Sequence, residues 1–272
     1  MNAAPALNPA LAVLVVAGAL LATTSPPAQA GRGCETKPVS TETLVRSLEL
    51  AERTARWLDT SGAGVVLLAR RGQNLDAYGV QWSHLGYAYR DERARAWRVV
   101  HKLNHCGTAE SALYRQGLAE FFSDDLYRFE AGVQVLAPAA QKALRPLLED
   151  NARAATLHEP AYSMVAFPWA TRYQQSNQWA LETLALAMEP SATDRARAQA
   201  WLQFKGYVPT TLRIDAMKRL GARVGSAHIA FDDHPNAQRF ADRIDTVTVD
   251  SVFRFVQSAG LASPAQTLPS VP

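Results

Sequence analysis

The sequence predicts an α+β fold, in which helices pack against an antiparallel sheet. Two observations support this class. Runs with strand-like patterns, separated by polar turns, are concentrated in the first half of the chain, whereas the second half has mostly helical periodicity. The 272 residues are 48% hydrophobic, which is enough for one compact domain with its own core. We therefore expect one domain over residues 31–260 and a disordered Pro/Ser-rich tail over residues 261–272.

The beginning of the chain has the pattern of an export signal. Residues 1–30 contain no Lys, Arg, Asp or Glu, and residues 10–22 form an apolar run too short to cross a bilayer comfortably. Ser25-Pro26-Pro27 interrupts this run, and Ala28-Gln29-Ala30 matches a cleavage site. We predict a signal peptide over residues 1–30, no transmembrane segment after its removal, and a periplasmic or secreted protein. The alternative is an uncleaved membrane anchor.

Export makes the cysteine count informative. Cys34 and Cys106 are the only two cysteines, and both follow the predicted cleavage position. An oxidising compartment favours one disulfide between them, which on the chain-entropy account stabilises the fold by roughly 4 kcal/mol. The alternative is that Cys106, next to His105 and near His101, is a nucleophilic thiol.

The charge pattern argues against nucleic acid as a partner. The formal net charge is +3, and no run of Lys and Arg is longer than Arg70-Arg71. The sequence predicts neither a cofactor nor a bound metal ion.

Hydrophobic period and turn residues predict the elements of the first half. A helix begins within Pro38-Val39-Ser40-Thr41-Glu42 and ends at Ser61-Gly62. Its predicted apolar face consists of Leu44, Leu48, Ala51, Ala55 and Leu58. Strands are expected at residues 63–69, 82–89, 96–103 and 126–136, with the second and third forming a hairpin, and helical turns at 107–114 and 117–122.

The second half is predicted to be mostly helical. Helices are expected at residues 138–149, 176–188, 194–204, 212–220 and 252–257. Pro146 should kink or end the first of them, and Asp250 should cap the last. Short strands are expected at residues 225–231 and 246–249.

The two hairpin strands each carry a histidine. W-S-H-L-G-Y-A-Y holds His84, and W-R-V-V-H-K-L holds His101. A histidine on a rigid strand, paired with a second polar side chain, is a common way to hold a base for a nucleophile. Gly86 shares a face with His84 and would leave space beside the imidazole. The alternative is a half-buried structural histidine bonded to backbone.

S-H-L-G-Y-A-Y resembles the S-H-x-G-I-x-V strand of the circularly permuted branch of the NlpC-type papain-like superfamily. That branch includes bacterial exported hydrolases and lecithin:retinol acyltransferase. The resemblance covers residues 65–188 and implies a permuted papain-like fold, with His84 as base and His101 as its orienting residue. It places the nucleophile at the start of a later helix, here R-Y-Q-Q-S-N-Q-W-A-L-E-T-L-A.

That helix contains no cysteine, and Ser176 or Asn177 occupies the expected position. Ser176 is a candidate hydroxyl nucleophile, whereas Asn177 cannot play that role. The alternative for Ser176 is a helix cap. Glu182 would face either the same cleft or solvent.

Two functions follow from this resemblance. Because the thiol is missing, we favour an exported protein that binds a peptide, glycan or lipid moiety of the envelope in a cleft around His84 and His101. The alternative is an active envelope amidase, peptidase or acyl-transfer hydrolase with Ser176, or Cys106, as nucleophile.

A second resemblance extends from Cys34 to Phe255. The segments H-K-L-N-x-C-G, F-F-x-D-D-L, Y-Q-Q-S-N-Q-W-A-L-E and F-D-D-H-P are similar to a bacterial exported family known only as a domain of unknown function. This resemblance implies no activity. Within F-D-D-H-P, Asp232-Asp233-His234 is either a partial metal site or acid–base pair, or a helix start capped by Asp233 or His234 with Pro235 in its first turn.

Overall fold

The centre of the molecule is a six-stranded antiparallel sheet with the strand order β4-β3-β2-β1-β5-β8. The computed structural model describes residues 39–123 and 126–269, so the predicted signal peptide and Cys34 lie outside the described residues. The strands are β1 (Val65–Arg71), β2 (His84–Asp91), β3 (Ala96–Asn104), β4 (Ser111–Gly117), β5 (Arg128–Val135) and β8 (Gln266–Leu268). The predicted α+β class, with helices packed on an antiparallel sheet, is confirmed.

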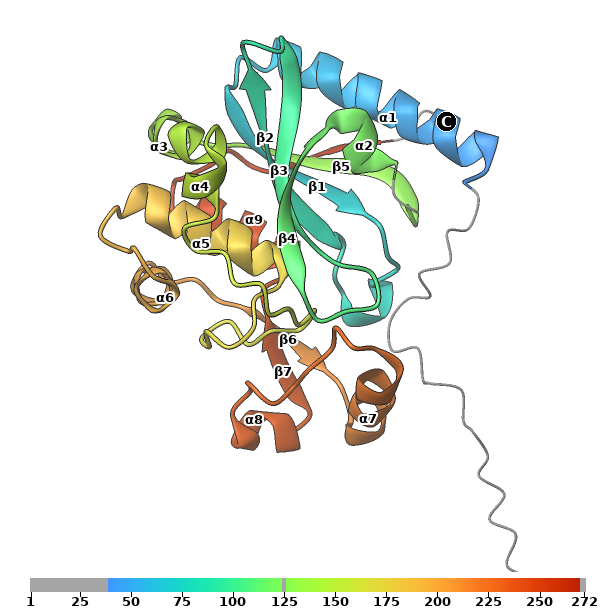
Figure 1. Cartoon of the computed structure of the whole chain (residues 1–272), viewed down its shortest axis with the longest axis vertical. Coiled ribbons are helices and arrows are strands. Elements are labelled where there is room, and N and C mark those ends of the chain that lie inside the picture. The colour runs from blue at the N-terminus through green and yellow to red at the C-terminus, as the bar shows by residue number, and fades with distance from the viewer. Residues whose placement is uncertain (1–38, 124–125, 270–272) are drawn as a thin grey trace, which may run out of the picture.

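Helices cover both faces of this sheet (Figure 1). One face carries α1 (Thr41–Thr60) and α2 (Leu118–Phe122), and the other carries α3 (Pro138–Leu148), α5 (Ser176–Met188) and α9 (Val249–Ser258). The helices α4 (Asn151–Ala154) and α6 (Arg195–Phe204) lie next to α3 and α5. A 3₁₀ turn, η1 (Asp76–Tyr78), lies in the connection between β1 and β2.

Strand alternation divides the core into two clusters, because successive side chains of a strand point to opposite faces. Leu67 of β1 belongs to the cluster that contains Trp179 of α5. Its neighbour Leu68 belongs to the cluster that contains Leu50 of α1 and Phe121 of α2. The helix α5 is apolar around most of its circumference because it is enclosed by the sheet, α6 and α9.

A smaller unit lies at the lower end of the molecule in Figure 1. It consists of the two-stranded sheet β6 (Thr210–Arg213) and β7 (Arg243–Thr246) with α7 (Ala216–Gly225) and α8 (Asn236–Phe240). Its small apolar cluster contains Val165, Ile214, Phe231 and Ile244. Across the part of the chain that the structure describes, no helix has the length and apolar character needed to span a membrane.

Two predicted helices were wrong or misplaced. Residues 107–114 were expected to be helical, but Ser111–Gly117 is strand β4 and extends the hairpin by pairing with β3. Gly107 turns the chain in the left-handed region with φ 71°, which favours glycine. In the predicted helix 212–220, Leu212 lies in strand β6, and α7 begins only after Asp215, whose side chain caps it.

The predictions for the C-terminal third also needed correction. Residues 225–231 form no strand, and in the predicted strand 246–249 only Thr246 belongs to β7, since Val249 begins α9. Thr248, rather than Asp250, caps α9, in a reciprocal capping box with Ser251. Within the tail predicted to be disordered, Gln266–Leu268 form β8, which pairs with β5. That pairing satisfies backbone groups that β5 would otherwise present at an open sheet edge.

The buried face of α1 is rotated relative to the prediction. Leu44 and Leu48 are exposed, whereas Leu50, Ala51 and Leu58 pack into the core. The N-cap is Ser40, whose hydroxyl accepts a hydrogen bond from the amide of Thr43. The capping signal therefore located the start of α1 correctly, and the predicted face is right for Ala51, Ala55 and Leu58 but wrong for Leu44 and Leu48.

Candidate functional site

The structure brings the two candidate histidines together. Nε2 of His84 lies 2.8 Å from Nδ1 of His101, and both rings pack against Phe121 of α2. His84 lies on the same face of β2 as Ala88, and His101 lies on the same face of β3 as Val99. Ala88 and Val99 belong to the cluster under α1 and α2, so both histidines point to the face that these helices cover. The histidine pair is therefore held between a strand hairpin and a helix.

Gly86 makes room for this pair. A Cβ atom added to Gly86 would lie 2.8 Å from Cγ1 of Val99 and 3.0 Å from Cβ of His101. The sequence predicted that Gly86 opens space beside His84 for an approaching group. In the structure, neighbouring side chains of β3 occupy that space.

A chain of hydrogen bonds fixes the tautomers of both rings. Gln116 donates from Nε2 to the Glu120 carboxylate, so its Oε1 is the atom that faces Nε2 of His101, at 2.7 Å. A neutral His101 therefore carries its proton on Nε2, which makes its Nδ1 an acceptor. His84 then donates from Nε2, and its own Nδ1 keeps an unshared electron pair.

Burial keeps His84 in this neutral form. Removal from water lowers the pKa of His84 well below its ordinary value, and the positive charge of Arg70 and the neighbouring His101 lower it further. Arg70 lies directly opposite His84 in the β1–β2 pairing, and it also donates a hydrogen bond to the backbone carbonyl of Phe121. A neutral imidazole with a free Nδ1 electron pair can accept a proton or a hydrogen bond.

A cavity of about 750 Å³ lies beside His84. It is located where β1 ends, β2 begins and β3 ends, and it extends to the small unit that contains β6, β7 and α7. Much of its lining is apolar, including Leu75, Val80, Trp82, Met164, Ile214 and Phe231. Because it lies at the end of the strands, side chains from both faces of the sheet reach it.

Ser176 and Asn177 line the same cavity at the N-terminus of α5. The hydroxyl of Ser176 lies beside Tyr162 and lowers the pKa of its phenol, which burial raises. Asn177 donates to the carbonyl of Val247, while its own carbonyl oxygen is buried without a hydrogen-bond partner. Ser176 is not the cap of α5, because the N-cap position belongs to Gln175.

The histidines and the start of α5 approach this cavity from different sides. The helix α5 packs on the sheet face that carries Tyr87, whose hydroxyl donates to the carbonyl of Ala180 at 2.6 Å. The histidines point to the other face. In the described residues, no hydrogen bond joins His84 to Ser176. The structure thus places both residues at one cavity without directly pairing them.

Cys106 also lines the cavity. Neither residues 39–123 nor residues 126–269 contain a free cysteine, so Cys106 offers no thiol nucleophile in this structure. Its predicted disulfide partner, Cys34, lies outside the described residues, and their pairing stays a prediction.

Asp232, Asp233 and His234 do not converge on one point. Asp232 pairs with Arg172 at 2.9 Å. Asp233 bonds Nδ1 of His234 at 2.9 Å and accepts from the backbone amide of Phe167 at 2.7 Å. No group of three or more His, Cys, Asp and Glu side chains suited to a metal ion occurs among the described residues.

The predicted cap at this motif was also wrong. The N-cap of α8 is Pro235, and neither Asp233 nor His234 caps the helix. Nε2 of His234 lies 3.0 Å from the carbonyl oxygen of Asp245 in β7. The motif therefore ties the loop at Phe167 to the small two-stranded sheet.

A second buried polar network lies on the opposite face of the sheet, and sequence reasoning missed most of it. Lys102, next to His101, is fully buried and donates from Nζ to the carbonyl of Glu159 and to Oε1 of Gln174. Its burial, together with the positive charge of Arg195, lowers the pKa of Lys102 to about 6. The only sequence signal for this site was a lysine within a strand otherwise rich in apolar residues.

Glu182 is the centre of this second network. Its carboxylate accepts from Nε of Arg195 at 2.8 Å and from Gln199 at 2.7 Å, and Gln174 also donates to it. Arg195 additionally donates to the carbonyls of Thr171, Ala170 and Tyr173. Glu182 therefore faces neither the cavity nor solvent, and it fixes the loop before α5 to α6.

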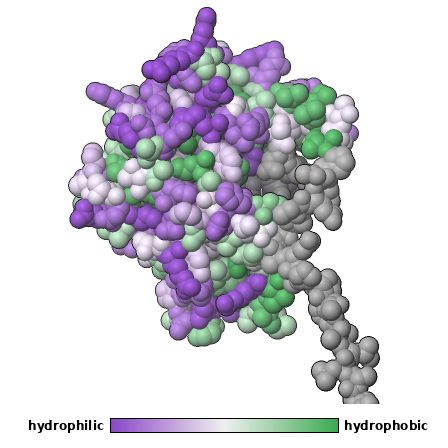
Figure 2. Space-filling model, viewed as in Figure 1, coloured by the Kyte–Doolittle hydropathy of each residue, from purple (hydrophilic) through white to green (hydrophobic). Residues whose placement is uncertain are grey.

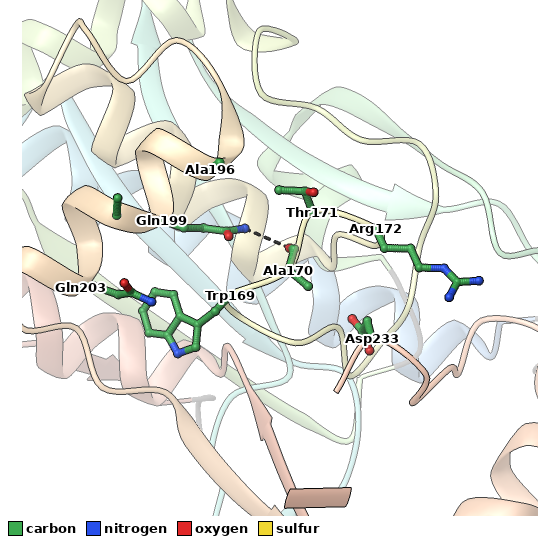
Figure 3. Close-up of a pocket in the computed structure, with 9 residues that line it drawn as sticks. Trp169, Ala170, Thr171, Arg172, Ala196, Gln199, Gln203 and Asp233 are labelled. Carbon is green, nitrogen blue, oxygen red and sulfur yellow. Dashed lines mark hydrogen bonds between the residues drawn. The ribbon is translucent and has the colours of Figure 1, made fainter. Parts of the chain in front are cut away.

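A second pocket, of about 550 Å³, lies at the surface between this loop and α6 (Figure 3). Trp169, Arg172, Gln199, Gln203 and Asp233 are among its lining residues. Some polar side chains of this pocket already form hydrogen bonds within the protein. One of them is Gln199, which donates to the carbonyl of Ala170, as drawn in Figure 3. The larger cavity beside His84 is the better candidate for a ligand site, because it is more extensive and mostly apolar.

Comparison with known proteins identifies the family. Residues 57–256 match a family described as an uncharacterized protein conserved in bacteria (DUF2145), and this range includes His84, His101 and Ser176. No curated protein and no solved structure matches the chain. The predicted resemblance to a bacterial family of unknown function is confirmed. Because the match covers 57–256 of 272 residues, the chain belongs to the DUF2145 family.

Proposed function

We propose that this protein is exported and binds an apolar moiety of the envelope, from a lipid or a peptide, in the cavity beside His84. The observation that carries the proposal is the cavity of about 750 Å³ with its mostly apolar lining. Among the peptide, glycan and lipid moieties that the sequence suggested, a glycan fits least, because its hydroxyl groups would be buried with few polar partners.

His84 supplies a polar contact at the strand end of this cavity. Its neutral ring donates from Nε2 to His101, so Nδ1 is available to accept from a ligand hydroxyl or amide. Ser176 and Thr246 contribute further polar groups to the lining. The ligand that fits has an apolar body and a hydrogen-bond donor at one end.

Binding is favoured over hydrolysis for two reasons. No hydrogen bond joins Ser176 to His84 among the described residues, and Cys106 has no free thiol. A hydroxyl nucleophile needs a base within hydrogen-bond reach to remove its proton. Without that pairing, the cavity can hold a ligand but lacks an activated nucleophile.

The test is displacement of an environment-sensitive naphthylamine dye by a long-chain fatty acid and by an apolar dipeptide. Ile229→Trp should fill part of the cavity and weaken binding of dye and competitor by about tenfold or more. The matched control is Val208→Trp, an exposed apolar position outside the lining, which should bind like the wild type. Equal binding by all three proteins would contradict a ligand site in this cavity.

The second candidate is an envelope amidase, peptidase or acyl-transfer hydrolase of permuted papain-like fold. The observation that favours it is that Ser176 begins a helix and lines the same cavity as a neutral His84. The chain order also agrees with the permuted arrangement, because the strands of His84 and His101 precede this helix. In this proposal His84 is the base, His101 its orienting residue and Ser176 the nucleophile.

Turnover separates the two candidates. Hydrolysis of ester or amide substrates that Ser176→Ala and His84→Ala both abolish, while each variant unfolds at the wild-type temperature, would establish the hydrolase. If the wild type hydrolyses nothing and Ser176→Ala still displaces dye, the binding proposal stands. His105→Ala is the matched control, because His105 is exposed and absent from the cavity lining.

The proposal also includes export with removal of residues 1–30 and a disulfide between Cys34 and Cys106. Mass spectrometry of protein recovered from the periplasm should give a chain that begins at Gly31. Its mass should be lower by two hydrogen atoms for a Cys34–Cys106 bond, and thiol titration under denaturing conditions should find no free sulfhydryl. A chain that retains residues 1–30 would instead indicate an uncleaved anchor.

A further inference from the structure

Only one side of α7 packs against the rest of the described molecule. Ala222 packs against the small cluster that contains Ile214 and Phe231. Arg219 donates to the carbonyl of Ile214 and pairs with Asp242 at 2.7 Å. None of the ten residues of α7 is fully buried, although the sequence of the helix is strongly amphipathic.

The opposite side of α7 presents an apolar stripe to solvent. Met217, Leu220 and Val224 are 76%, 57% and 60% exposed. Their spacing of i, i+3 and i+7 places them along one face of the helix. Figure 2 shows the hydrophobic colour gathered over α7 at the lower end of the molecule. Amphipathic helices of soluble proteins normally turn such a face inward, so this stripe lacks the partner that its pattern predicts.

Cations flank the stripe on both sides. At helical spacing, Lys218 projects on one side of it and Arg223 on the other, and both are exposed. Lys218 has one acidic neighbour, Asp215, at 3.4 Å. Arg213, just before α7, and Arg243, at the start of β7, are exposed cross-strand partners in the β6–β7 sheet. Like charges placed directly opposite are unfavourable unless an anion lies nearby.

We propose that α7 docks flat on an anionic membrane surface. An apolar stripe flanked by cations matches the boundary between acyl chains and anionic head groups. A second copy of the chain fits less well, because a two-fold interface would bring the same patch, with Lys218 and Arg223, against itself. Lys218, Gly221 and Ala222 also line the large cavity, so a docked α7 would place one wall of that cavity at the bilayer surface.

Vesicle flotation tests this surface. Vesicles of equal parts phosphatidylcholine and phosphatidylglycerol should bind the protein, whereas phosphatidylcholine alone should bind it more weakly. The triple variant Met217→Ser/Leu220→Ser/Val224→Ser should lose about tenfold or more in binding. Lys218→Gln and Arg223→Gln should each cost about fivefold at low salt and nothing at high salt.

The matched control is Phe204→Ser/Val208→Ser, which removes two exposed apolar side chains outside α7 and should leave binding unchanged. Every variant carries the same N-terminal residues, so any contribution of the apolar run at residues 10–22 is common to all. Unfolding temperatures should agree among the variants, because the substituted side chains are exposed.

Three outcomes would overturn the proposal. They are equal binding to neutral and anionic vesicles, binding that survives the triple variant, and a dimer in solution that only the triple variant dissociates. Dye binding in the cavity does not depend on α7 docking, so the vesicle test can fail while the ligand proposal stands.

Discussion

His101 and Lys102 are neighbours in β3, and both are fully buried, yet they belong to networks on opposite faces of the sheet. His101 connects His84 to Gln116 and, through it, to an exposed carboxylate. Lys102 joins a closed network with Glu182 at its centre. The histidine network ends at the large cavity, whereas the Glu182 network is centred on a buried ion pair away from that cavity.

This difference separates a candidate for function from a structural element. The histidine chain ends in a buried His84 whose pKa is lowered, and among the described residues no hydrogen bond reaches its Nδ1. The opposite network satisfies nearly every polar atom and joins three segments distant in sequence. We therefore expect changes in the second network to alter stability most, and changes in the first to alter ligand binding most.

The largest effect should follow from Glu182→Gln. This change leaves the Arg195 charge buried without its counter-ion, and breaking such a pair typically costs about 3–5 kcal/mol. Urea unfolding would measure the loss. Glu52→Gln is the matched control, because Glu52 pairs with Arg56 on the exposed side of α1 and should cost under about 1 kcal/mol. Similar losses for both variants would show that the Glu182–Arg195 pair contributes no more than an exposed ion pair.

The second effect is a pH dependence that originates at Lys102. The buried amine has a pKa of about 6, whereas an unfolded lysine keeps its proton up to about 10.5. Between these values the unfolded chain binds more protons than the folded one. The free energy of unfolding therefore rises with pH across this window, by at most about 1.4 kcal/mol per pH unit, and falls as pH drops toward 6.

Lys102→Met tests this assignment by removing the titrating group. The slope of unfolding free energy against pH should flatten between about pH 6 and 10. Lys142→Met, at an exposed position of α3, should keep the wild-type slope. An unchanged slope in Lys102→Met would mean that Lys102 remains charged in the folded protein.

A smaller effect is expected from Gly86→Ala, on the histidine side. The added methyl would meet Val99 and His101 at 3.0 Å or less, so the hairpin must shift, at a cost of about 1–3 kcal/mol. The shift should also separate the two rings and weaken dye binding in the cavity. Gly117→Ala, with no atom near the added carbon, is the control. If Gly86→Ala keeps wild-type stability and dye binding, β3 can shift to accommodate the methyl group at little cost in free energy.

The smallest effect on stability should come from Gln116→Leu. It removes the acceptor for Nε2–H of His101, at a cost of about 1 kcal/mol, while Glu120 is already exposed. Long-range proton–nitrogen NMR spectra should show the wild-type His84 ring protonated on Nε2, and a mixture of tautomers in the variant. A single unchanged tautomer would indicate that Gln116 does not fix the ring.

Local sequence signals located some elements well and misjudged others. The capping serine before α1 and the apolar run of β1 were sufficient, because both signals act within a few residues. Residues 107–114 and the tail were misjudged because β4 and β8 exist through pairing with β3 and β5. Strand pairing of this kind depends on a distant partner, which periodicity within a short window cannot reveal.

The sequence by itself determined the class of the fold, the two histidines on neighbouring strands and the start of α5 at Ser176. Only the tertiary structure decided that the histidines face α2 while α5 covers the opposite face. It also decided that Glu182 pairs with Arg195 in the interior. The physical reason is that alternation assigns relative faces within a strand, but packing of distant segments determines which helix covers each face and which charges meet there.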